Sequence, residues 1–123
     1  MILIYDKKGF TPLLTLDALS LRGADLRQAQ LPEANLVQVD LCGADLSDAD
    51  LSHADLRLSK LCNARLQRCN LSGADLSGAD LTGADLCDAI LINTRLDRAR
   101  LPDGFASDAR SQLAAISVRS EPT

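Results

Sequence analysis

Acidic side chains are the commonest groups in this sequence that could do chemistry, because 17 of the 123 residues are Asp or Glu. Paired carboxylates can act as general acid and base, and clustered carboxylates can bind calcium. Many of the aspartates, however, recur in the tetrapeptide Gly-Ala-Asp-Leu, at residues 23–26, 43–46, 73–76, 78–81 and 83–86. A periodic Asp is more simply structural, with a side chain that faces solvent and accepts hydrogen bonds from nearby backbone turns. The sequence also lacks the Gly-Gly-x-Gly-x-Asp unit of calcium-binding β-rolls.

A second group with chemical potential consists of Asp50, Ser52 and His53, the residue types of a hydrolase triad. These residues are close in sequence, and nothing around them predicts a pocket or an oxyanion hole. We therefore expect His53, the only histidine, to lie exposed on a solvated face. The sequence predicts no catalytic residues and no enzymatic activity.

The four cysteines could bind a metal or form disulfides. They are Cys42, Cys62, Cys69 and Cys87, and no two of them have the CxxC spacing. A structural zinc site needs four Cys or His ligands at defined spacings, and the single histidine does not supply such a set. We expect neither a metal site nor a cofactor.

The elements that would position these groups follow from one repeat. Leucine occupies every fifth position from Leu16 to Leu101, and a small residue, usually Ala, stands two positions before each Leu. Five residues turn an α-helix by about 500°, so a helix would gather these leucines on no single face. A flat strand fails as well, because the apolar spacing alternates between 2 and 3. A short extended Ala-Asp-Leu step followed by a two-residue turn fits the pattern, and the sequence therefore predicts a solenoid.

The tandem Ala-Asp-Leu-x-x pattern over residues 19–103 resembles the pentapeptide-repeat family. The resemblance implies an all-β solenoid, a right-handed quadrilateral parallel β-helix in which 20 residues complete one coil, so that this chain forms about four coils. It also implies that the Leu and the preceding Ala point inward and that the other three positions face solvent. The implied leucine core consists of Leu36, Leu41, Leu46, Leu51, Leu56, Leu61, Leu66, Leu71, Leu76, Leu81 and Leu86.

A 20-residue coil places residues 20 apart in sequence above one another. One outward column then contains Asp48, Arg68 and Asp88, whose opposite charges alternate. Other columns are Asp40, Lys60, Asp80, Arg100; Asn35, Asp55, Asp75, Arg95; and Asp25, Asp45, Arg65, Asp85. Such pairs are mildly favourable, which agrees with the coil length. Cys42 and Cys62 become surface neighbours within disulfide reach, although a cytosolic setting favours free thiols.

Both ends depart from the repeat. We divide the chain into an N-terminal cap of one strand and a loop at residues 1–15, the β-helix at 16–103, and a C-terminal capping helix with a frayed tail at 104–123. Ser107 and Asp108 can cap this helix. Its apolar face could cover the last coil, or it could join two copies into a dimer, so both monomer and homodimer stay open. The candidate interaction residues are Ile90, Ile92, Leu113 and Ile116.

Composition narrows the function. A net charge of −4 argues against a nucleic-acid-binding surface, and no apolar run is long enough to span a membrane. Since no signal peptide is evident, we expect a cytoplasmic protein, and the family resemblance favours a bacterial source. A narrow coil filled by leucine leaves no room for a ligand. We expect a rigid module that binds another protein, whose identity the sequence does not give.

The alternative comes from a branch of the resembled family whose members mimic duplex DNA and inhibit or protect DNA gyrase. A mimic should present a continuous acidic stripe. Here a basic belt of Arg57, Lys60, Arg65 and Arg68 interrupts the acidic residues. The banded charge weighs against the mimic.

Overall fold

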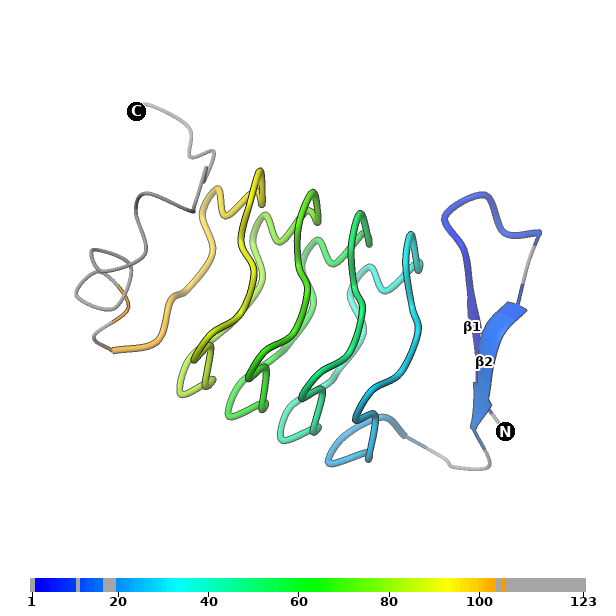
Figure 1. Ribbon diagram of the computed structural model, residues 1–123, viewed down its shortest axis with the longest axis horizontal. Helices are drawn as coiled ribbons and strands as arrows, with labels where there is room; N and C mark the ends of the chain where they lie inside the picture. Colours follow the sequence, from blue (N-terminus) through cyan, green and yellow to red (C-terminus); the bar gives the residue numbers. More distant parts are fainter. Residues whose placement is uncertain (1, 11, 17–19, 104, 106–123) are drawn as a thin grey trace.

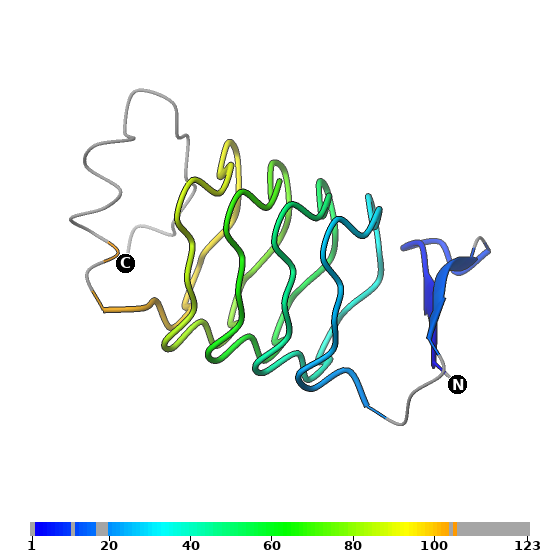
Figure 2. The same cartoon turned by 60° about the horizontal axis from the view of Figure 1, so that its bottom comes forward.

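The structure is a computed structural model that describes residues 2–10, 12–16, 20–103 and 105. Its main body is a stack of coils that run side by side along one axis, as Figure 1 shows. A hairpin lies at the N-terminal end of the stack, and Figure 2 shows it beside the first coil from a second direction. The two strands of the hairpin are β1 (Ile2–Tyr5) and β2 (Pro12–Leu16), which pair antiparallel.

The coils are joined by parallel bridges between residues 20 apart. Asp45 bridges to Arg65 and Arg65 to Asp85, for example, and the same step recurs on each of the four sides. Two backbone hydrogen bonds close each link: Leu46 N–H donates to Arg65 O at 2.7 Å, and Arg65 N–H donates to Ala44 O at 2.9 Å. The expected coil length of 20 residues is therefore confirmed. Each side contributes a single bridged residue, because a turn follows within two residues.

The turns explain the five-residue period. Ala24 N–H donates to Leu21 O at 3.1 Å, and the equivalent bond recurs in every unit through Leu96. The second residue after each Leu has a positive φ, as a type II turn requires, whether it is a glycine such as Gly43 (73°) or a side-chain-bearing residue such as His53 (58°). The repeated carboxylate supports the next turn, since Asp45 Oδ1 accepts Ser47 N–H at 3.0 Å. The structural role predicted for the periodic aspartates is confirmed at this position.

The core is a column of leucines. Each leucine of the implied core from Leu36 to Leu81 is at most 2% exposed, and the alanines Ala44, Ala54 and Ala64 beside it are at most 1% exposed. Leu86 differs from the expectation, because it is only partly buried. The repeat ends at Leu101, and position 106, where the next leucine above Leu86 would fall, is Ala.

The outward positions also differ in part from the expectation. The residue directly after Leu is buried in three units, at Cys42 (7%), Ser47 (7%) and Asp97 (8%). This residue opens the turn, and the Ser47 hydroxyl there donates to Asp45 while Asp97 pairs with Arg95. Cys42 and Cys62 occupy it in adjacent coils and form a disulfide with a Cα–Cα distance of 4.6 Å. The expectation of free thiols at these two positions is wrong in this structure, since the coil step brings them within bonding distance.

The hairpin covers the N-terminal end of the core. Ile4 of β1 is 3% exposed and belongs to the core, with Ile2, Leu13 and Leu14 packed against it. Asn35 N–H donates to Tyr5 O at 2.8 Å, so β1 is also tied to the first coil. The sequence predicted one strand and a loop, whereas the structure has two strands, because Pro12–Leu16 supplies a second partner for Ile2–Tyr5.

Two expectations concern the remaining segments. The capping helix with Leu113 and Ile116 lies outside the described residues, and the division at 15/16 and 103/104 stays a prediction. Within the described ranges, no helix has both the length and the apolar character needed to cross a bilayer.

Candidate interaction surface

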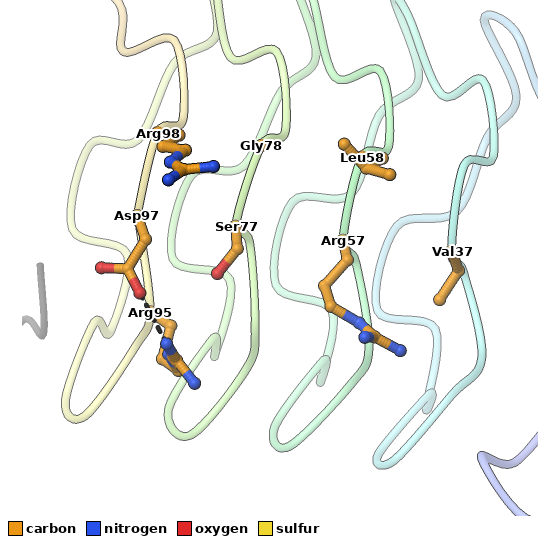
Figure 3. Close-up of a pocket in the computed structure, with 8 residues that line it drawn as sticks. All are labelled: Val37, Arg57, Leu58, Ser77, Gly78, Arg95, Asp97 and Arg98. Atoms are coloured by element: carbon orange, nitrogen blue, oxygen red, sulfur yellow. Dashed lines mark hydrogen bonds and ion pairs between the residues drawn. The ribbon is translucent and has the colours of Figure 1, made fainter. Parts of the chain in front are cut away.

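An open groove of about 520 Å³ runs across the coils on one corner of the stack (Figure 3). Two columns line it, and within each column the residues are 20 apart, one per coil. The first column is Val37, Arg57, Ser77, Asp97, and the second is Leu58, Gly78, Arg98, with Arg95 beside them. The groove is therefore a product of the coil repeat, which stacks four turns of different composition.

The charges in this groove are layered. Arg57 makes two bonds to Asp55, at 2.7 and 2.8 Å, and its side chain is 55% exposed while that of Asp55 is 17% exposed. Arg95 pairs with Asp97 at 2.7 Å, and the two side chains are 46% and 8% exposed. The hydrogen bonds from the Arg57 guanidinium hold the pKa of Asp55 below its usual value. In both pairs the carboxylate lies beneath and the guanidinium faces the solvent.

Arg98 and Leu58 complete the groove. Arg98 is exposed and makes no ion pair or side-chain hydrogen bond within the part of the chain that the structure describes. Leu58 is 55% exposed, and its Cδ2 lies over Gly78, where an added Cβ would approach it to 2.7 Å. Because Gly78 has no side chain, the Leu58 side chain can lie over it, in the same coil as Arg57 and two coils from Arg98 (Figure 3).

A second groove, of about 660 Å³, is polar and largely paired within itself. Arg68 donates two bonds to Asp48, at 2.8 and 3.1 Å, across one coil step. Arg27 pairs with Asp25 within one unit at 2.8 Å. Of the charge columns predicted from the sequence, the Asp48–Arg68 pair is confirmed, whereas Lys60 and Arg65 form no ion pair among the described residues.

The residues that the sequence singled out for chemistry do not form a site. Asp50 accepts the backbone N–H of Ser52 at 2.9 Å and so supports a turn. The imidazole of His53 lies across Gly73, where an added Cβ would clash with His53 Nδ1. No group of three or more His, Cys, Asp or Glu side chains suited to a metal ion occurs in the described ranges.

The candidate interaction residues can be placed in part. Ile90 and Ile92 are 42% and 43% exposed on either side of buried Leu91, on the last coil. Leu113 and Ile116 lie outside the described residues. Sequence reasoning missed the groove of Figure 3, although the column Val37, Arg57, Ser77, Asp97 follows from the same 20-residue step that was used for the charge columns.

The repeat itself decides the family. The sequence profile of pentapeptide repeats matches residues 20–57 and 64–103 in 8 copies, which is more than half of the chain. The chain belongs to the pentapeptide-repeat family. Members of this family form right-handed quadrilateral β-helices, and the coils described above agree with that fold.

Solved pentapeptide-repeat structures resemble this one. The protein alr5209 from Nostoc PCC 7120 is 31% identical, with a TM-score of 0.53 over 77% of this chain and 84% of that one. A thylakoid-lumen protein of Arabidopsis thaliana is 26% identical, with a TM-score of 0.35 over 67% of this chain and 53% of that one.

HetL, from Nostoc sp. strain PCC 7120, is involved in regulating heterocyst differentiation. It is 32% identical, with a TM-score of 0.34 over 65% of this chain and 54% of that one. Among curated proteins the comparison found no significant match. These comparisons give no support to the gyrase-mimic alternative.

Proposed function

We propose that this pentapeptide-repeat protein is a non-catalytic module that binds another protein through the outer faces of its coils. The single observation that carries the proposal is the order of the outer side chains. Each column is held by backbone hydrogen bonds at every coil, as between Leu46 and Arg65, so its side chains keep a fixed spacing of about 4.8 Å along the axis. A rigid surface of this kind loses little conformational entropy when it binds a partner.

The interior supports a binding role over a catalytic one. The leucine and alanine side chains between Leu31 and Leu81 fill the core, since the leucines are at most 2% exposed. The two grooves described above lie on the outside and are open. Enzyme sites are usually concave and enclose most of a small ligand, whereas open grooves suit an extended segment of another protein.

The proposal can be tested by affinity capture from the native extract with two baits. The wild-type chain should recover the same partner reproducibly. Leu66→Asp should not, because Leu66 is fully buried and an unpaired charge there unfolds the coils. If the wild-type bait recovers no protein beyond those that the unfolded bait recovers, the proposed function is wrong.

A further inference from the structure

We infer that the groove lined by Arg57, Leu58 and Arg98 binds an extended acidic segment that carries one apolar side chain. This inference rests on the proposed protein-binding function and names the chemistry of the partner. Among the described residues, exposed arginines and an exposed leucine line this same groove (Figure 3). The second groove pairs Arg27 and Arg68 with exposed carboxylates, and no apolar side chain lines it.

Charge is the first part of the argument. The carboxylates that pair with Arg57 and Arg95 are sunk, at 17% and 8% side-chain exposure, so a partner meets the guanidinium groups first. Arg98 adds a positive charge that no described carboxylate balances. A carboxylate can accept two parallel bonds from a guanidinium, which makes Asp or Glu side chains suitable partners here.

Spacing is the second part. Arg57 and Arg98 lie two coils apart along the axis, or about 10 Å at roughly 4.8 Å per coil. An extended peptide covers this length in about three residues, at roughly 3.3 Å per residue. Two acidic side chains on either side of a short extended segment with one apolar side chain would therefore reach both arginines.

The apolar floor is the third part. Leu58 is 55% exposed, and its Cδ2 lies over Gly78, the glycine of the next coil. An apolar side chain placed between two carboxylates would cover Leu58 and remove that surface from water. A buried apolar contact ringed by charged pairs is the arrangement found at many protein interfaces.

The occupant is a peptide segment and not a nucleic acid because of the surrounding charge. The chain carries a net charge of −4, and Asp75 and Asp80 lie in the same coil as Ser77 and Gly78. A long polyanion would meet these carboxylates beyond the groove, whereas a short acidic segment stays within it.

The test uses a fluorescein-labelled peptide of sequence Glu-Ser-Leu-Ser-Glu, with the Gln-Ser-Leu-Ser-Gln peptide as a neutral control. Fluorescence anisotropy with the full chain should show saturable binding of the acidic peptide and weakening as salt rises from 50 to about 500 mM. Arg98→Gln and Leu58→Ser should each weaken binding roughly tenfold. Both side chains are exposed, so these variants should keep the fold, which thermal unfolding checks.

Arg22→Gln is the matched control, because Arg22 is an exposed arginine outside the groove and should leave affinity unchanged. The inference is overturned if no peptide binds, if Arg98→Gln and Arg22→Gln behave alike, or if a 12-base-pair DNA duplex binds as tightly as the acidic peptide. A captured partner that binds wild type and Arg98→Gln equally would overturn this inference while leaving the proposed function standing. Absence of any captured partner would instead overturn the proposed function.

Discussion

Cys42 and Cys62 are 20 residues apart in the chain and 4.6 Å apart at their Cα atoms, joined by a disulfide between neighbouring coils. This covalent link spans one full coil of the β-helix. The same 20-residue step places the residues of every outer column above one another. The same step places Arg68 over Asp48 and Leu58 over Gly78. The disulfide and the order of the outer side chains therefore depend on one geometric repeat.

Reduction of the disulfide should destabilise the protein. A disulfide that closes a loop of about 20 residues lowers the entropy of the unfolded chain and so stabilises the fold by roughly 3 kcal/mol. Reduction with dithiothreitol should therefore lower Tm by roughly 10–20 °C. The Cys42→Ser/Cys62→Ser variant should have the same Tm as the reduced wild-type protein, whether or not reductant is present. Thiol titration of the oxidised, denatured chain should find only Cys69 and Cys87. Four reactive thiols and an unchanged Tm would contradict this account.

Two glycines with similar backbone conformation should respond differently to alanine. Gly23 and Gly73 have φ values of 66° and 69°, so Ala at either position costs about 1 kcal/mol of backbone strain. No atom of the described residues lies within 4 Å of a Cβ at Gly23, but a Cβ at Gly73 would meet the ring of His53. Chemical denaturation should therefore show a larger loss for Gly73→Ala. In a His53→Ala background the two losses should become equal, and a persistent difference would count against the His53 contact.

Buried hydroxyls provide a second matched pair. Ser59 is 1% exposed at an inward alanine position, and its Oγ has no hydrogen-bond partner among the described residues. Thr94 is fully buried, and its Oγ1 donates to Leu71 O at 2.8 Å. Ser59→Ala should raise the free energy of unfolding by about 1 kcal/mol, whereas Thr94→Val should lower it by about the same amount. Urea unfolding would refute this assignment if Ser59→Ala were destabilising.

Acid should destabilise the coils. The hydrogen bonds from Arg27 lower the pKa of Asp25 to about 2, and bonds from neighbouring side chains and backbone lower the pKa of further carboxyls. A carboxyl whose pKa is depressed in the folded state stabilises the fold above its unfolded value near 4, and this contribution is lost as the pH falls through the folded value. Tm should therefore be level from pH 7 to 5 and fall from pH 5 to 2. A Tm that rises in this range would contradict the prediction. The further carboxyls are those of Asp40, Asp45, Asp48, Asp55 and Asp80.

The repeat made most of the fold predictable. Because Leu46 and Ala44 recur with a fixed period, their inward orientation and the turn after each Leu follow from the sequence alone. The scarcity of aromatic residues has the same origin, since a narrow coil has room for Leu and Ala. Tyr5, Phe10 and Phe105 all lie outside the repeats, and Phe10 is 83% exposed.

The parts that escaped prediction depend on contacts without a period. The second strand, Pro12–Leu16, forms because it pairs with Ile2–Tyr5. This pairing lies outside the repeat, so the repeat does not predict it. The layering of Arg57 over Asp55 depends on side-chain conformation, which spacing does not give. The 20-residue step predicts which side chains line the groove. The exposure of Leu58, however, depends on side-chain conformation and cannot be read from that step.

Site-specific photo-cross-linking is the most direct test of whether outer side chains of the coils contact another protein. A photoreactive benzoylphenylalanine at position 58, in place of the exposed Leu58, and a second at position 22, in place of Arg22, would be irradiated in the native extract. We expect one discrete protein adduct from position 58 and little or none from position 22, if the outer side chains bind another protein. The proposed function would be contradicted if neither these positions nor exposed positions on the other faces, such as Ile90 and Ile92, yielded a protein adduct.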